Sequence, residues 1–235
     1  DEVKRLTALP ILAMIPGSKR KRITQDEPKS LLAESFRTAR INLQYLNPDA
    51  ARQVIGFTSS TSGEGKTFCA VNLATVMAMS GKRTIIIDSD LRRPKLGETM
   101  EMPEGDGLST YLIGESTLEQ VIRRCDIPGL DVITAGPIPP NPLELVESER
   151  MKELFRILRG RYDHIVVDAS PMGLVSEFKV LVQHVDVTLY VVRQGYTRRG
   201  MLRPLGDMVR EGKLKHTDVV LNDVKAAEGY GYYTA

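Results

Sequence analysis

The sequence VIGFTSSTSGEGKTFCAVNLATVMAMSGKRTIIIDSD at residues 54–90 decides the fold. An apolar, β-branched run at 54–57 gives way to a loop rich in serine, threonine and glycine, which closes on Gly65, Lys66 and Thr67. A long helix-compatible segment follows, and a second apolar run then ends in two aspartates. This order of strand, loop, helix and strand is typical of a parallel α/β sheet.

The loop is similar to the phosphate-binding signature G-x-x-x-x-G-K-[ST], except that Ser60 replaces its first glycine. Gly63 and Gly65 allow consecutive backbone N–H groups to turn toward a polyphosphate, and the following helix adds its positive amino-terminal end. Lys66 supplies charge to the β- and γ-phosphates, and the Thr67 hydroxyl is a ligand for Mg²⁺. The loop therefore predicts a site for ATP and Mg²⁺. The alternative, a glycine-serine turn that ends in Lys-Thr by chance, is disfavoured by its place between a strand and a helix.

The composition indicates one α/β domain with an amino-terminal extension in a chain of 235 residues. The net charge of +2 favours no particular partner, and we expect no nucleic-acid ligand. Cys69 and Cys125 have no zinc or disulfide spacing, so reduced thiols are expected. No apolar run approaches the length of a membrane span, and the chain begins without methionine or a signal peptide, which predicts a fragment of a longer protein.

Aspartates end two of the predicted buried strands. Asp88 and Asp90 follow the apolar run at 85–87, and Asp168 ends the run at 164–168. We expect a metal or proton-transfer role for the first two, with helix capping as the alternative, and a Mg²⁺-holding role for Asp168. Because strands and helices alternate along the whole chain, we predict a doubly wound, mostly parallel sheet covered on both faces. Helices are expected at 143–159 and 175–184, and residues 96–107 are expected to form a loop over the site.

A helix is predicted from residue 28 to about residue 46, where apolar residues recur at helical spacing. These residues are Leu32, Phe36, Ala39, Leu43 and Leu46. Glu34 and Arg37 fall on the opposite side of the helix and Arg40 at its border, so the simplest interpretation is a solvated face.

The two ends of the chain are expected to differ from the domain at 28–228. Residues 1–27 read as a linker, in which 9–16 is an extended segment on the domain surface. The basic cluster at 19–22 fits either an anionic lipid surface or a solvated linker. Residues 229–235 read as a flexible tail that presents three tyrosines, with packing on the domain or on a partner as the alternative.

These segments together resemble the cytoplasmic catalytic domain of bacterial tyrosine kinases, the BY-kinase family tied to capsule and exopolysaccharide export. The resemblance covers nearly the whole chain. It is carried by a Walker A loop at 59–67, a Walker A′ run IIIDSDLR at 85–92, a Walker B run IVVD at 165–168, the E-x-x-R-x-x-R pattern ESFRTAR at 34–40, PPNPLEL at 139–145 and VLND at 220–223. The fold that it implies is a P-loop NTPase of the deviant Walker, MinD-like type.

The resemblance implies roles for particular residues. Catalysis would rest on Lys66, Asp88, Asp90 and Asp168, and Mg²⁺ on Thr67, Asp88 and Asp168. The nucleotide would contact Ser62, Gly63, Glu64, Gly65, Lys66, Thr67, Phe68 and Asn222. Oligomerisation would use Glu34, Arg37 and Arg40, which replaces the solvated-face interpretation, and the phosphoacceptors would be Tyr230, Tyr232 and Tyr233.

The resemblance also implies partners and a location. The kinase would form a homo-oligomeric ring, an octamer in the family, in which one subunit phosphorylates the tail of the next. A transmembrane and periplasmic activator, in the same or a separate chain, and a cognate tyrosine phosphatase would be its partners. The expected location is the cytoplasmic face of the bacterial inner membrane, and the expected role is regulation of exopolysaccharide or capsule export.

Two alternatives remain open from the sequence. A ParA/MinD-type ATPase shares the fold, but its signature lysine would fall at Thr61, and it leaves the tyrosine tail unexplained. An inactive nucleotide-binding scaffold is the other, and the intact Lys66, Asp88, Asp90 and Asp168 argue against it.

Overall fold

One mixed sheet forms the centre of the protein. The computed structural model describes residues 2–20, 22–23, 30–46, 52–173, 177–214 and 216–225. Within them, eight strands lie in the order β1-β8-β7-β2-β6-β3-β5-β4, and every pair is parallel except β4 with β5. The strands are β1 (Ile11–Pro16), β2 (Gln53–Ser59), β3 (Thr84–Asp88), β4 (Arg123–Arg124), β5 (Leu130–Ile133), β6 (His164–Asp168), β7 (Val187–Arg193) and β8 (Thr217–Val224). The predicted doubly wound, mostly parallel sheet is confirmed.

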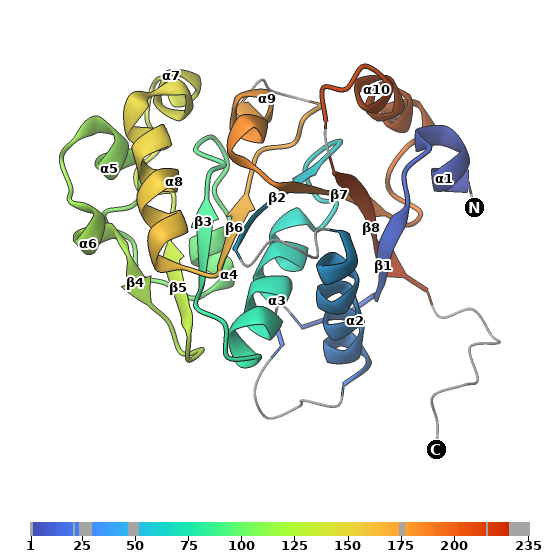
Figure 1. Cartoon of the computed structure of the whole chain (residues 1–235), viewed down its shortest axis with the longest axis horizontal. Coiled ribbons are helices and arrows are strands. Elements are labelled where there is room, and N and C mark those ends of the chain that lie inside the picture. Colours follow the sequence, from blue (N-terminus) through green and yellow to red (C-terminus); the bar gives the residue numbers. More distant parts are fainter. Residues whose placement is uncertain are drawn as a thin grey trace.

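Helices cover both faces of this sheet (Figure 1). Helices α2 and α3 lie on one face, and α1, α8, α9 and α10 lie on the other. The helices are α1 (Glu2–Thr7), α2 (Leu31–Leu46), α3 (Lys66–Met79), α4 (Leu96–Thr99), α5 (Leu108–Ile113), α6 (Leu118–Val121), α7 (Pro142–Glu147), α8 (Glu149–Arg161), α9 (Glu177–Leu181), the 3₁₀ turn η1 (Val182–His184) and α10 (Arg199–Arg210). None of the helices in the described ranges has the length and apolarity that crossing a bilayer requires.

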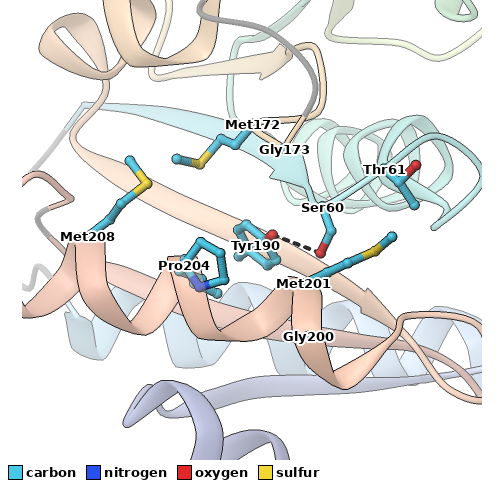
Figure 2. Close-up of a pocket in the computed structure, with 10 residues that line it drawn as sticks. Ser60, Thr61, Met172, Gly173, Tyr190, Gly200, Met201, Pro204 and Met208 are labelled. Atoms are coloured by element: carbon cyan, nitrogen blue, oxygen red, sulfur yellow. Dashed lines mark hydrogen bonds between the residues drawn. The ribbon is translucent and has the colours of Figure 1, made fainter.

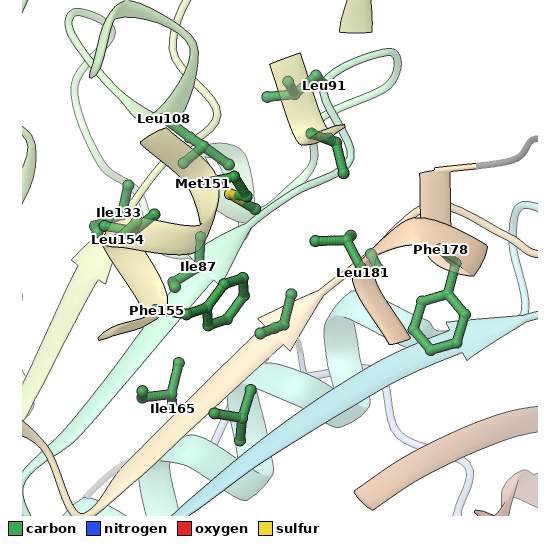
Figure 3. Close-up of a cluster of buried hydrophobic side chains, with 14 of the residues drawn as sticks. Ile87, Leu91, Leu108, Ile133, Met151, Leu154, Phe155, Ile165, Phe178 and Leu181 are labelled. Carbon is green, nitrogen blue, oxygen red and sulfur yellow. The ribbon is translucent and has the colours of Figure 1, made fainter. Parts of the chain in front are cut away.

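The buried strands supply alternate side chains to two separate cores, because successive residues of a strand point to opposite faces. In β3, Ile85 and Ile87 join the core under α8, whereas Ile86 joins the core under α3. Figure 3 shows the first of these cores, where Phe155 of α8 packs over the sheet. Both faces are therefore apolar, which explains why the central strands read as unbroken hydrophobic runs.

The amino-terminal segment takes part in the sheet. We expected residues 9–16 to be an extended surface segment, and residues 11–16 instead form the edge strand β1, parallel to β8. Its apolar side chains explain the difference, because Leu12 and Ile15 are buried while Met14 is half exposed. Helix α1 was not predicted, and it packs against α10 at Gly206, where a Cβ would lie 3.0 Å from the Leu6 carbonyl oxygen.

Three other predicted elements differ in detail. The helix expected at 143–159 is broken at Ser148, which has extended backbone angles and caps α8 by accepting the Met151 N–H. The helix expected at 175–184 is the short α9 followed by η1, with 174–176 outside the described residues. The loop expected at 96–107 begins with the single turn α4. At Ser148, local capping divides a segment that apolar periodicity alone joins.

If β1 belongs to the folded core, Ile15→Ala will lower the free energy of unfolding by about 2–4 kcal/mol, the usual loss for a fully buried Ile. Met14→Ala is the matched control on the same strand, with an expected change of about 0.5 kcal/mol or less, because Met14 is 50% exposed. Urea unfolding of the two variants measures both changes. Equal effects at both positions would contradict the pairing of β1 with the sheet.

Candidate active site

The phosphate-binding loop connects β2 to α3, with its glycines in a backbone conformation that other residues rarely adopt. Gly63 and Gly65 have φ values of 86° and 90°, in the left-handed region. Gly65 directly precedes the first turn of α3, so Lys66 and Thr67 project from the start of a helix. The sequence signature therefore has the local geometry that its glycines predicted.

Ser60, which replaces the first glycine of the signature, has a specific partner. Its hydroxyl lies 2.9 Å from the Tyr190 hydroxyl of β7 (Figure 2). Burial raises the pKa of Tyr190 to about 12, so the phenol stays neutral and can donate. The pair borders a cavity of about 300 Å³ between the start of the loop and α10, which Met172, Met201 and Met208 line. The hydrogen bond fixes the entrance of the loop to the neighbouring strand.

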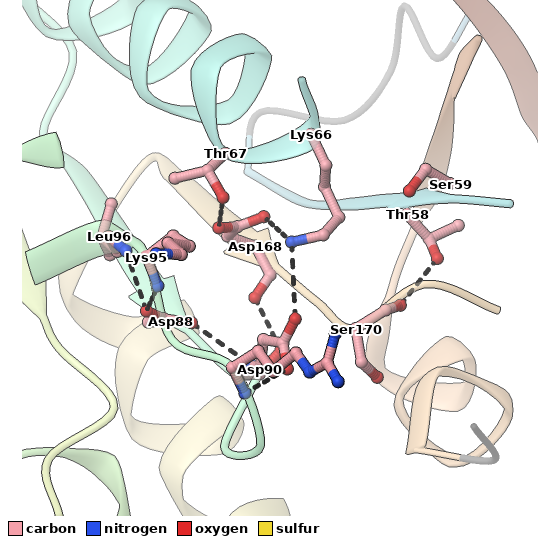
Figure 4. A network of polar contacts seen from close by, with 12 residues as sticks. Thr58, Ser59, Lys66, Thr67, Asp88, Asp90, Lys95, Leu96, Asp168 and Ser170 are labelled. Atoms are coloured by element: carbon pink, nitrogen blue, oxygen red, sulfur yellow. Dashed lines mark hydrogen bonds and ion pairs between the residues drawn. The ribbon is translucent and has the colours of Figure 1, made fainter. Parts of the chain in front are cut away.

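Asp168 at the end of β6 binds both polar side chains at the start of α3 (Figure 4). Its Oδ1 accepts from Lys66 Nζ at 2.6 Å, and its Oδ2 accepts from Thr67 Oγ1 at 2.6 Å. Asp168 is fully buried, and only 9% of Lys66 is exposed. The Walker A lysine and threonine are thereby joined to the Walker B aspartate.

Asp88 lies beside Asp168, because the two residues are register partners on adjacent parallel strands. Its oxygens accept the backbone N–H groups of Asp90, Lys95 and Leu96 at 3.0–3.2 Å. Complete burial raises the pKa of the Asp88 carboxyl to about 7, and the nearby Asp168 carboxylate adds to the rise. A carboxyl with this pKa exchanges a proton near neutral pH.

Asp90 is the more accessible member of the aspartate pair. Its Oδ1 accepts the Arg93 N–H at 3.1 Å, and its Oδ2 lies 3.9 Å from Lys66 Nζ. Burial raises the pKa of the Asp90 carboxyl, and 6% of the residue remains exposed. Burial alone would lower the pKa of Lys66, but Asp168, Asp90 and Asp88 raise it above its ordinary value. Lys66 is therefore a stable cation at the centre of three carboxylates.

The donor set at this edge fits Mg²⁺. Thr67 Oγ1 and the carboxylates of Asp168 and Asp88 are hard oxygen donors, which Mg²⁺ prefers. Among the described residues, no group of three His, Cys, Asp or Glu side chains forms a metal cage. A Mg²⁺ ion here would therefore take few protein ligands and complete its octahedron with phosphate oxygens and water, as is usual in phosphoryl-transfer sites.

The structure gives two predicted nucleotide-binding residues other partners. The Glu64 carboxylate is fully buried and accepts the Thr61 N–H at 2.9 Å and the Thr197 hydroxyl. Asn222 Nδ2 donates to the Glu64 carbonyl oxygen at 3.0 Å. Sequence reasoning missed Thr197, since it lies far along the chain in a turn without a motif.

A second missed contact fixes the Walker A′ segment. Arg92 forms an ion pair with Glu177 at the start of α9, and only 2% of Glu177 is exposed. Glu177 Oε2 is buried with no hydrogen-bond partner among the described residues. A buried carboxylate is costly unless a cation is paired with it, and Arg92 is that cation for Glu177. The ion pair therefore connects the turn at 88–92 to the start of α9.

The predicted oligomerisation residues and the Phe68 side chain lie away from this cluster. Glu34, Arg37 and Arg40 are on α2, where Arg37 donates to Glu34 and the Arg40 Nε is buried without a partner in the described part of the chain. Phe68 of α3 packs edge-on against Phe36 of α2, with ring centroids 6.0 Å apart. The predicted acceptors Tyr230, Tyr232 and Tyr233 lie outside the described residues.

A phosphate loop on a parallel sheet, with Lys66, Thr67 and Asp168 in contact, defines a P-loop nucleotide-binding protein. A family model described as an AAA domain matches residues 52–211. The chain is 35% identical to the tyrosine-protein kinase YwqD of Bacillus subtilis (strain 168), over 92% of this chain and 93% of that protein. It is 32% identical to the tyrosine-protein kinase etk of Escherichia coli (strain K12), over 88% of this chain but 29% of that longer protein.

Solved structures agree. The E. coli ETK kinase domain matches with a TM-score of 0.86 at 30% identity, over 99% of this chain and 98% of that one. The chimerical protein CapA2B2 matches with a TM-score of 0.89 at 33% identity, over 96% and 99% of the two chains. The chain therefore belongs to the bacterial tyrosine-protein kinase family, and it is a protein-tyrosine kinase as predicted. MinD from Pyrococcus horikoshii, complexed with Mg-ADP, matches with a TM-score of 0.59 and 20% identity, over 72% of this chain and 68% of that one. This likeness shows a shared fold alone.

The raised pKa of Asp88 has a consequence for stability. Because the folded-state pKa of about 7 lies above the ordinary 3.8, protonation of Asp88 stabilises the folded protein, and this contribution is lost as the pH rises through 7. We expect Asp88→Asn to gain stability relative to the unchanged protein as the pH rises from about 4 to about 7, with no further gain above that.

Chemical denaturation across this pH range measures the difference. Asp106→Asn, a change at an exposed aspartate, serves as the control and should leave the pH profile unaltered. If the profiles of Asp88→Asn and the unchanged protein run parallel, the buried acid does not titrate in this window.

Proposed function

We propose that this kinase autophosphorylates the tyrosines of its carboxyl-terminal tail between subunits and so regulates exopolysaccharide or capsule export. One observation carries the catalytic part of the proposal. Lys66 and Thr67 both donate to Asp168 at the phosphate loop, and Asp88 and Asp90 lie beside them. This cluster is built for a polyphosphate with a metal, next to carboxylates that can receive a proton.

Different residues of the site serve different parts of phosphoryl transfer. The N–H groups of the loop and the start of α3 bind the phosphate chain of ATP. Lys66 neutralises charge that develops on the transferred group. Thr67 and Asp168, with Asp88, would hold Mg²⁺, which offsets the charge of the phosphates. In this arrangement catalysis is mainly a matter of position and charge.

The acceptor tyrosine must meet a carboxylate that orients or deprotonates its hydroxyl. Asp88 and Asp90 suit this role in different ways. Asp88 has a pKa near neutrality, but its oxygens are engaged by three backbone N–H groups. Asp90 has an oxygen that faces Lys66 and a small exposed area. A nucleophilic hydroxyl beside either group gains the proton acceptor that the reaction needs.

A ring of subunits would bring a tail to a neighbour's site, and α2 has a surface suited to such contacts. Leu31, Ile41 and Tyr45 are 63%, 43% and 79% exposed, and Glu34 lies on the same side of the helix. An exposed apolar stripe with charges at its border is typical of a protein interface. We therefore propose that Glu34, Arg37 and Arg40 take part in homo-oligomerisation, with the octamer of the family resemblance as the expected form.

The remaining partners follow from the resemblance to capsule and exopolysaccharide kinases. They are a transmembrane and periplasmic activator, a cognate tyrosine phosphatase, and a location at the cytoplasmic face of the inner membrane. Lys19 of the basic cluster is exposed, whereas Arg22 is paired with Asp126 at 2.6 Å. At most part of this cluster is therefore available to an anionic surface.

Purified protein incubated with Mg²⁺ and ATP should gain phosphotyrosine confined to Tyr230, Tyr232 and Tyr233. Lys66→Met should abolish the signal, because it removes the cation that Asp168 holds near the phosphates. Mass spectrometry of the tail measures the outcome. Hydrolysis of ATP without phosphotyrosine would refute autophosphorylation.

The combined change Arg37→Ala and Arg40→Ala should leave nucleotide binding intact and break the oligomer. Lys152→Ala with Arg156→Ala is the matched control, since it also removes two basic residues from a helix, at positions paired with Glu149 and Glu153. Light scattering reports the mass of both variants. An unchanged mass for the α2 variant would refute the proposed ring interface.

A further inference from the structure

Three consecutive carbonyl groups of the phosphate loop accept hydrogen bonds from side chains outside the loop. The donors come from the last residue of β7, from the turn after it and from the end of β8. The Ser62 oxygen accepts from Tyr196 Oη at 3.1 Å, the Gly63 oxygen from Arg193 Nη1 at 2.9 Å, and the Glu64 oxygen from Asn222 Nδ2 at 3.0 Å. The outer side of the loop is therefore held by three side chains that no phosphate-loop motif contains.

We propose that Arg193, Tyr196 and Asn222 are positioning residues for the phosphate-binding amides. In a planar trans peptide the C=O and the following N–H point in opposite directions. When the carbonyls of residues 62–64 are fixed toward these side chains, the N–H groups of residues 63–65 are turned to the other side, where phosphate binds. The three donors thus set the direction of the N–H dipoles before the nucleotide arrives. The proposal rests on nucleotide binding at this loop.

The glycines of the motif are adapted to the same contacts. A Cβ on Gly63 would lie 2.8 Å from the Tyr196 hydroxyl oxygen, and a Cβ on Gly65 would lie 2.0 Å from Asn222 Nδ2. Both distances are too short for a side chain. The glycines therefore permit the close approach of the outer side chains as well as the left-handed backbone of the loop.

Further contacts hold the three donors in place. Arg193 Nε donates to Asp223 Oδ2 at 3.0 Å, and its guanidinium lies 5.1 Å from the centre of the Tyr196 ring. The Gln194 N–H donates to the Asn222 carbonyl at 3.0 Å, which ties the turn to β8. Donors whose own orientation is fixed lose little entropy when they bind the loop, and this is what pre-organisation requires.

A purely structural role does not account for Tyr196. The residue is 48% exposed, so its hydroxyl could be hydrated at little cost if the loop did not use it. Its bond to Ser62 contributes to one local feature, the direction of the Gly63 N–H. Removing the hydroxyl should therefore affect phosphate binding more than the stability of the fold.

The experiment compares Tyr196→Phe with Tyr162→Phe. Each variant loses one tyrosine hydroxyl that donates a hydrogen bond, and the Tyr162 hydroxyl binds Asp131 at 2.7 Å, just before β6 begins and away from the loop. Titration calorimetry with Mg·ADP should give an affinity about three- to tenfold weaker for Tyr196→Phe and unchanged for Tyr162→Phe. Asn222→Asp, which sets an acceptor against the Glu64 carbonyl, should weaken binding more.

A kinetic measurement separates positioning from chemistry. Because the amides contact the phosphates in the ground state as well as the transition state, Tyr196→Phe should raise the KM for ATP more than it lowers kcat. Equal Mg·ADP affinity for Tyr196→Phe and the unchanged protein would overturn the proposal, as would an equal loss in Tyr162→Phe. If the unchanged protein does not bind Mg·ADP, nucleotide binding itself fails, which is a distinct result.

Discussion

The contact of the Asp168 carboxylate with Lys66 and Thr67 is the interaction on which the site depends. It joins the end of β6 to the start of α3 and sets one ammonium among three buried carboxylates, those of Asp168, Asp88 and Asp90. Such a cluster has more negative than positive charge, and this excess contributes to the raised pKa of Asp88. Charges are expensive to bury without partners, so a cluster of this composition is typical of a functional site.

Sequence patterns predicted the parts of this arrangement that follow from local chemistry. Apolar runs that end in Asp88 and Asp168 predicted two buried parallel strands, and the structure makes these aspartates register partners. The glycines of the loop predicted its left-handed turns, and Lys66 and Thr67 predicted the start of a helix. Periodicity could not predict the break at Ser148, because a capping serine interrupts a helix without changing its apolar pattern.

Contacts between distant segments could not be predicted in this way. Arg193 ends β7, and Tyr196 and Thr197 belong to the turn after it, which has no motif. These residues reach the loop because β7 lies next to β2 in the sheet. The contact of the Asn222 amide with the backbone of the loop is of the same kind, and the expected contact of Asn222 with the nucleotide stays a prediction. The position of a strand in the sheet decides which turn lies behind the phosphate loop. The apolar pattern of a single sequence does not predict that strand order.

The pairing of β1 with β8 has a consequence for how the domain is made. Ile11 is the register partner of Val219, so an edge of the sheet joins the two ends of the described chain. On a ribosome β1 emerges before α2 and the six strands from β2 to β7, and its partner β8 appears only after them. Until then the buried side chains Leu12 and Ile15 have only neighbours such as α2 to cover them, and the strand edge stays open. The sheet therefore cannot be completed by local pairing, and its edge closes only through a contact of long sequence separation.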